Sequence, residues 1–259
     1  MASEKFLFLH LPKNGGTSLR DMLSSWFPAE RTCPYRTDED YKANFSDADL
    51  ADYDYFTGHI PAAVAKRFFA DEMPKLTVLR NPVDRIYSLY AYWRNYELPE
   101  ANILDKPEKG AVPELYAREL QGPLMAKEHS FGSFLFCDNP YIKRVLTNPQ
   151  ARFLTEKKNL PQLGAMDPQE AVDAILANVE TMNITVSTLE TPAHLLRTLG
   201  ELAERFGIEE PVELPHSNKS ERVFFEGLDE ERVAQYLRLV CPLDFMLYDH
   251  FLKQNRAVA

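Results

Sequence analysis

The sequence has little that would tie it to a membrane or to an oxidising compartment. Its 259 residues include three cysteines, Cys33, Cys137 and Cys241, which are too widely spaced to form a metal-binding motif and indicate a reducing environment. No apolar run approaches the roughly 20 residues that a membrane-spanning helix needs. The first ten residues also lack the basic segment and cleavage pattern of a signal peptide. We therefore expect a cytoplasmic protein without a membrane span.

Positive charge is also scarce. The chain has 29 Lys and Arg residues against 39 Asp and Glu residues, a formal net charge of −10. This balance argues against broad binding to nucleic acid or to an anionic membrane surface. An anionic ligand would have to be held by a local cluster of Lys and Arg side chains.

Short apolar segments alternate with amphipathic ones along the chain. The apolar runs at 6–11, 53–58, 76–79 and 184–186 predict strands, and helices are expected from Thr17, Pro61, Pro82, Ala171 and Pro192 onward. This order predicts an α/β fold of three layers, with a central parallel sheet flanked by helices. We expect a single domain over 1–259, a loop-rich segment at 28–52, and an insert or flap at about 97–130, where prolines and charges gather.

The first strand leads into a glycine turn and a helix. The turn, Pro12 to Ser18, contains Lys13, Asn14, Gly15 and Gly16, with Thr17 as the expected N-cap. Backbone N–H groups and the positive end of the helix dipole would converge there, and Lys13 adds a full charge. The pattern predicts an anion site, although a turn that only links strand and helix has the same composition.

This turn differs from the ATP-binding loop G-x-x-x-x-G-K-[ST], because its lysine precedes the glycines. No Lys-Ser/Thr pair stands at the helix start to hold phosphate and Mg²⁺ together, and no predicted strand clearly ends in a metal-binding Asp. Both features weigh against a standard NTPase or kinase.

A second phosphate-binding element is predicted at the end of another strand. Arg80 leaves the strand at 76–79, and Ser88 lies about two turns into the helix that follows. These two side chains could grip a second phosphate group. The alternative is a structural salt bridge for Arg80 and a packing role for Ser88.

Together these segments resemble a known family. HLPKNGGTSL resembles the 5′-phosphosulfate loop of sulfotransferases that use 3′-phosphoadenosine 5′-phosphosulfate (PAPS), and LRNPVDRIYSLYAYW resembles their 3′-phosphate segment. The most similar branch includes heparan sulfate 2-O-sulfotransferase and related carbohydrate sulfotransferases. Gly58-His59, NPQARFL (148–154), LPHSNKSE (214–221) and DFMLYDHF (244–251) extend the resemblance along most of the chain.

The resemblance implies a P-loop-like fold, PAPS as the donor and a set of site residues. The residues expected to bind the donor are Lys13, Asn14, Gly15, Gly16, Thr17, Ser18, Arg80, Ser88, Lys219 and Ser220. Gln150 and Arg152 are the expected contacts to the acceptor. Asn14 departs from the family pattern, which commonly has Thr there, but the backbone of the loop is unaffected.

Sulfuryl transfer requires a base for the acceptor and positive charge at the leaving phosphate, and it requires no metal. We expect His59 to be the general base and Lys13 to stabilise the phosphate. An imidazole with a pKa near 6.5 is largely neutral at pH 7. His10, one step from the loop, is the rival base, and a helix-capping role for His59 is the alternative.

The sequence therefore predicts a PAPS-dependent sulfotransferase acting on a hydroxyl of a carbohydrate or small molecule. A Mg-ATP-dependent small-molecule kinase with an atypical loop and a non-catalytic nucleotide-binding module remain the alternatives.

Overall fold

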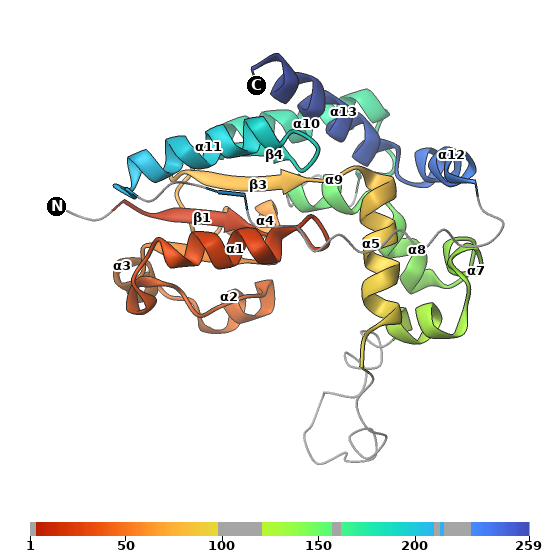
Figure 1. The fold of residues 1–259 in the computed structure, drawn as a ribbon, viewed down its shortest axis with the longest axis horizontal. Coiled ribbons are helices and arrows are strands. Elements are labelled where there is room, and N and C mark those ends of the chain that lie inside the picture. The colour runs from red at the N-terminus through yellow and green to blue at the C-terminus, as the bar shows by residue number, and fades with distance from the viewer. Residues whose placement is uncertain (1–3, 98–120, 157–161, 210–212, 215–228, 259) are drawn as a thin grey trace, which may run out of the picture. The chain divides into compact units, whose positions relative to one another are not determined.

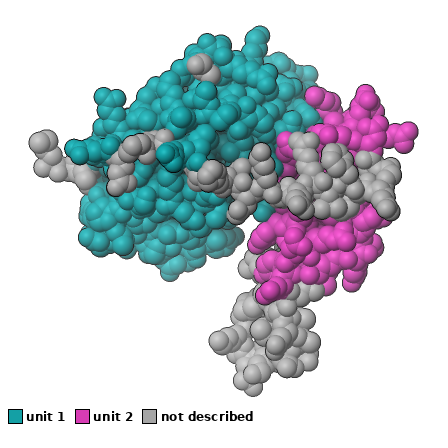
Figure 2. Space-filling view, viewed as in Figure 1, with its two compact units in different colours: residues 1–82, 148–218, 242–259 teal, residues 83–147, 219–241 magenta. Residues whose placement is uncertain are grey.

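The computed structural model describes residues 4–97, 121–156, 162–209, 213–214 and 229–258 (Figure 1). The chain forms two compact units, coloured separately in Figure 2. The first comprises 1–82, 148–218 and 242–259, and the second comprises 83–147 and 219–241. The insert expected at about 97–130 falls mainly outside the described residues, and the expected single domain stays a prediction.

The first unit is built on a four-stranded parallel sheet. Its strands are β1 (Phe6–Leu9), β2 (Tyr55–Gly58), β3 (Lys75–Leu79) and β4 (Ile184–Thr188), in the order β2-β1-β3-β4. Leu9 pairs with Gly58 on one side and with Thr77 on the other. Because every pairing is parallel, the carboxyl ends of all four strands share one edge of the sheet. The predicted α/β fold with a central parallel sheet flanked by helices is confirmed.

The helices of this unit follow the predicted alternation with the strands. They are α1 (Gly16–Ser25), α2 (Asp38–Asn44), α3 (Asp47–Asp52), α4 (Ala62–Ala65), α9 (Pro149–Leu154), α10 (Pro168–Thr181), α11 (Pro192–Arg205) and α13 (Pro242–Ala257). A short 3-10 helix spans Ala29–Arg31.

The expectation of a loop-rich segment at 28–52 is wrong in part, since α2 and α3 lie within it. Both helices begin with a capping box, in which a Ser or Thr side chain and the Asp three residues later cap each other's backbone N–H groups. The pairs are Thr37 with Asp40 and Ser46 with Asp49. The polar composition that suggested loops is therefore the signal for two helix starts.

Alternating side chains of the strands build one core on each face of the sheet. Phe6 and Phe8 of β1 pack with residues of α1 and α11, and Leu7 and Leu9 pack with residues of α4, α9, α10 and α13. These four side chains are at most 1% exposed. Burying each contributes roughly 1.5–3 kcal/mol, which fixes the register of β1 and hence the place where the chain leaves the sheet after Leu9.

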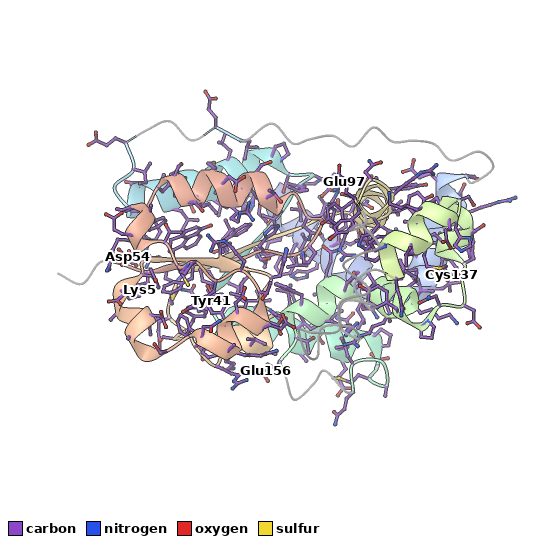
Figure 3. All side chains as sticks on the ribbon, turned by 90° about the horizontal axis from the view of Figure 1, so that it is seen from below. Lys5, Tyr41, Asp54, Glu97, Cys137 and Glu156 are labelled. Carbon is purple, nitrogen blue, oxygen red and sulfur yellow. The ribbon has the colours of Figure 1, made fainter. Side chains whose placement is uncertain are left out.

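Hydrogen bonds and ion pairs of charged side chains stabilise the amino ends of the strands. Lys75 is 1% exposed, and the three hydrogens of its Nζ are shared among four backbone carbonyls at 2.7–3.2 Å, those of Ala70, Asp71, Met73 and Met182. Lys5 and Asp54, labelled in Figure 3, form an ion pair with Nζ and Oδ1 3.7 Å apart. These contacts hold the amino edge, opposite the edge where the predicted site residues lie.

The second unit contains α5 (Pro82–Arg94) from its second residue on, together with α7 (Phe131–Leu135), α8 (Pro140–Leu146) and α12 (Glu230–Val240). Helix α5 begins at Pro82, as predicted, and its aromatic residues pack against α7. The Tyr87 and Phe131 rings stack with centroids 4.4 Å apart, and Tyr90 meets Phe131 edge-on at 5.2 Å. No helix within the described residues is long and apolar enough to cross a membrane.

Candidate functional site

The loop between β1 and α1 has the backbone of an anion cradle. Lys13 has φ 69° and Gly15 has φ 72°, whereas Asn14 and Gly16 are not among the residues with positive φ, so the sign alternates along the turn. Successive residues whose φ alternates between negative and positive values direct their N–H groups into a common concavity. Lys13 is strained in this conformation, because a residue with a Cβ disfavours positive φ.

The start of α1 adds to this cradle. The helix begins at Gly16 with Gly15 as its N-cap, so the expectation that Thr17 caps the helix is wrong. No side chain caps this end, and the first N–H groups of a helix have no partner within the helix. Thr17 is exposed and Ser18 half-buried in the first turn. A phosphate group fits this set of donors and the positive end of the helix dipole.

Asn14 was expected to bind the donor, but its side chain points into the protein. It is 1% exposed, and its Nδ2 donates to the Val78 carbonyl at 2.7 Å and to Gln150 Oε1 at 2.9 Å. Both amide hydrogens are thereby used. The side chain of Asn14 therefore ties the loop to β3 and to Gln150.

His10 packs behind the start of α1. A Cβ added at Gly16 would lie 2.0 Å from His10 Cδ2, so only glycine permits this approach. The His10 ring is 6% exposed and stacks on Phe8 with centroids 5.7 Å apart. Burial, followed by the charges of His59, Arg20 and Lys13, lowers the pKa of His10 to about 3. A buried, neutral ring in this position supports the loop.

His59 follows β2 at the same edge of the sheet, with its ring centroid 4.5 Å from that of His10. Its Nδ1 lies 2.7 Å from the His10 carbonyl oxygen. Because a carbonyl can only accept, Nδ1 must carry the proton, and the neutral ring then has its lone pair on Nε2. The residue as a whole is exposed, and its contact with the His10 carbonyl is part-buried.

The surroundings of His59 keep it neutral near pH 7. Partial desolvation by the neighbouring protein is the main cause that lowers its pKa, and the charges of Arg20 and Lys13 act in the same direction. The hydrogen bond to the His10 carbonyl opposes them. Arg20, one turn into α1, was not among the predicted site residues. Its place four residues after Gly16 puts it on the same side of the helix, which is the signal that could have found it.

Arg80 lies at the carboxyl end of β3 and contacts the loop directly. Its Nη1 donates to the Lys13 carbonyl at 3.2 Å. The backbone of Arg80 is held by Gln150, whose Oε1 accepts from Arg80 N at 3.0 Å and whose Nε2 donates to Arg80 O at 3.0 Å. The structure thus brings together two elements that are 67 residues apart in the sequence.

Gln150 was expected to contact the acceptor, and the structure places it elsewhere. Its side chain is fully buried, and its amide serves Asn14 and Arg80. Arg152 is half-buried in the last turn of α9. Ser88 is buried within α5 of the second unit. Lys219 and Ser220 lie outside the described residues.

Two carboxylates near this edge were not predicted from the sequence. Glu190 follows β4, and its Oε1 accepts from the backbone N–H of Asn81 at 3.0 Å, just before α5. Asp244 of α13 accepts from the N–H groups of Gln150 and Ala151. Within the described residues, no group of three or more His, Cys, Asp or Glu side chains is placed to hold a metal ion.

Comparison with known proteins assigns this chain to no family. No protein-family model matches the sequence, and neither does any curated protein. Among solved structures, the chain is similar to the crystal structure of a sulfotransferase from Alicyclobacillus acidocaldarius, with 16% sequence identity and a TM-score of 0.43. The alignment covers 96% of this chain and 97% of that one. A likeness of this degree assigns neither a family nor a function.

Proposed function

We propose that this protein is a PAPS-dependent sulfotransferase whose acceptor is a hydroxyl group of a carbohydrate or small molecule. The observation that carries the proposal is the pairing of an anion cradle with a tautomerically fixed histidine at one edge of the sheet. Lys13 to Ser18 form the cradle, and His59 presents Nε2 beside His10, whose ring packs against Gly16. The resemblance of both segments to sulfotransferase motifs supports the same function.

The donor site of this proposal is the loop with Arg80. The N–H groups from Gly15 to Ser18 would hold the 5′-phosphate, and Lys13 would supply the full positive charge there. Arg80, already hydrogen-bonded to the loop, would lie at the 3′-phosphate. Ser88, Lys219 and Ser220 stay donor contacts that only the resemblance to sulfotransferases implies. When bound, PAPS would supply the sulfuryl group and leave as adenosine 3′,5′-bisphosphate.

The acceptor step uses His59. Nε2 would take the proton of the acceptor hydroxyl while the acceptor oxygen bonds to sulfur and the bond from sulfur to the phosphate oxygen breaks. The imidazolium so formed would keep its hydrogen bond from Nδ1 to the His10 carbonyl. Lys13 and the N–H groups of the loop would stabilise the negative charge that grows on the phosphate oxygen. Removing one such donor typically costs about 2.7–4 kcal/mol in the barrier.

The test is thermal melting with adenosine 3′,5′-bisphosphate and, separately, with ATP and Mg²⁺. At a hundredfold excess over its dissociation constant a ligand adds about 2.7 kcal/mol, which corresponds to a rise of roughly 5–11 °C for a chain of this size. We expect this rise with the bisphosphate, its loss in Arg80→Ala, and its retention in Arg67→Ala, because Arg67 is exposed and stands over Phe68.

His59→Ala should keep the melting shift and lose sulfuryl transfer, because His59 acts on the acceptor. A shift with ATP and Mg²⁺ alone would refute the proposal in favour of a kinase. Binding of the bisphosphate without turnover in the unmodified protein, across hydroxyl acceptors of both classes, would favour a non-catalytic nucleotide-binding module.

A further inference from the structure

The buried amide of Gln150 joins the two elements of the donor site. It contacts the loop through Asn14 and the end of β3 through both backbone groups of Arg80, at 2.9–3.0 Å. The side chain is fully buried. A buried amide with its donor and acceptor both engaged is held in one orientation, since each alternative leaves polar groups unpaired.

The helix that carries Gln150 is itself held in place by a reciprocal pair of caps. Asp244 of α13 accepts from Gln150 N at 3.2 Å and from Ala151 N at 2.8 Å, at the start of α9. In return, Asn148 Oδ1 accepts from Leu243 N at 3.0 Å, at the start of α13. Asn148 and Asp244 are 7% and 1% exposed. The starts of α9 and α13 therefore cap each other, and these contacts fix the position of the backbone that carries Gln150.

This arrangement unites segments that are far apart in the sequence. Asn148 and Gln150 belong to NPQARFL, and Asp244 begins DFMLYDHF. The hydrogen bonds of Gln150, Asp244 and Asn148 described above all go to other groups of the protein. Through these contacts the two segments hold the loop and Arg80 at one separation.

We infer that Gln150 is a positioning residue that sets the spacing between the loop at 13–18 and Arg80, and that it thereby favours a ligand with two phosphate groups over a ligand with one. The inference rests on the proposed function, which assigns one phosphate to each element. A ligand that binds both elements gains from their being held at the matching distance, as in any two-point attachment. A ligand with only the 5′-phosphate needs the loop alone, and Asn14 still ties the loop to Val78 when Gln150 is changed.

The experiment is isothermal titration calorimetry of the full chain with adenosine 3′,5′-bisphosphate and with adenosine 5′-monophosphate. The variant is Gln150→Met, which keeps the length of the side chain and removes its hydrogen bonds. The control is Gln169→Met, since Gln169 is exposed at the start of α10. We expect Gln150→Met to raise the dissociation constant of the bisphosphate by about tenfold or more and that of the monophosphate by less than about threefold.

An equal loss of affinity for the two nucleotides, or no loss for either, would overturn the inference. Should Gln150→Met fail to fold, Asp244→Asn keeps one accepting oxygen at the start of α9 and should lower the preference for the bisphosphate in the same direction. Failure of the unmodified protein to bind the bisphosphate refutes the proposed function instead, so the two failures are distinguishable.

Discussion

Gly16→Ala should destabilise the protein even though alanine is the better helix former. The added Cβ would lie 2.0 Å from His10 Cδ2 and 2.4 Å from His10 Nε2. Carbon atoms pack best at about 3.5–4.0 Å, so the ring would have to retreat by about 1.5 Å. It has no room to do so, because it is 6% exposed and lies against Phe8 on one side and His59 on the other.

Overpacking in a core usually costs about 1–3 kcal/mol. A contact this short against a confined ring places Gly16→Ala near 3 kcal/mol, a fall of roughly 6–12 °C in Tm for a chain of this size. The matched control is Gly200→Ala in α11, where no atom lies within 4 Å of the added Cβ. That substitution should stabilise the protein by about 0.5–1 kcal/mol, so the two changes should shift Tm in opposite directions.

The assay is thermal unfolding followed by far-UV circular dichroism. A double-mutant cycle then locates the cause, because Gly16→Ala should cost at least about 1 kcal/mol less in a His10→Ala background. The reasoning fails if Gly16→Ala melts with the unmodified protein, or if its cost is the same whether or not the His10 ring is present.

Other predictions need no ligand. Between pH 7 and pH 5 the unfolding free energy should fall by about 2 kcal/mol through His10. The pKa of His10 is about 3 in the folded protein, so on acidification the unfolded chain binds the proton before the folded one does. In urea melts, the unfolding free energy of His10→Phe should depend less on pH, and an unchanged pH dependence would count against this. ¹⁵N NMR at pH 7 should show His59 protonated at Nδ1, and a proton on Nε2 would contradict the assigned tautomer. Lys75→Met should lower the unfolding free energy by about 3 kcal/mol, whereas exposed Lys253→Met should stay within about 0.5 kcal/mol in the same urea melts. Lys13→Gly should be more stable than Lys13→Ala by about 0.5–1 kcal/mol, because only glycine tolerates the positive φ, and equal stabilities would refute that strain.

Local signals in the sequence were enough for the main elements of the sheet. The apolar runs gave the four strands, whose bounds in the structure differ from the prediction by only a few residues at either end. The segment at 28–52 shows where such reasoning failed. Its apolar pattern is weak, and the two helices there depend on capping boxes rather than on a continuous hydrophobic face.

The sequence by itself determined the α/β class and the elements on which the candidate site is built. The glycine turn, the strand-end Arg80 and the strand-end His59 could be predicted because each depends on a few consecutive residues. The roles of individual polar side chains depended on which distant group each one meets. Asn14 and Gln150 looked like ligand contacts in the sequence, but tertiary packing buries both and pairs them with each other.

The tautomer of His59 likewise depends on the His10 carbonyl, 49 residues away. The position of Gln150 depends on the Asp244 carboxylate, 94 residues away. A hydrogen bond requires its partners within about 3 Å, and only the parallel pairing of the strands and the packing of α9 on α13 bring these groups so close. The sequence thus determined which candidate groups stand at the ends of the strands, and the tertiary structure decided which of them stay exposed and which are buried and hold the others in place.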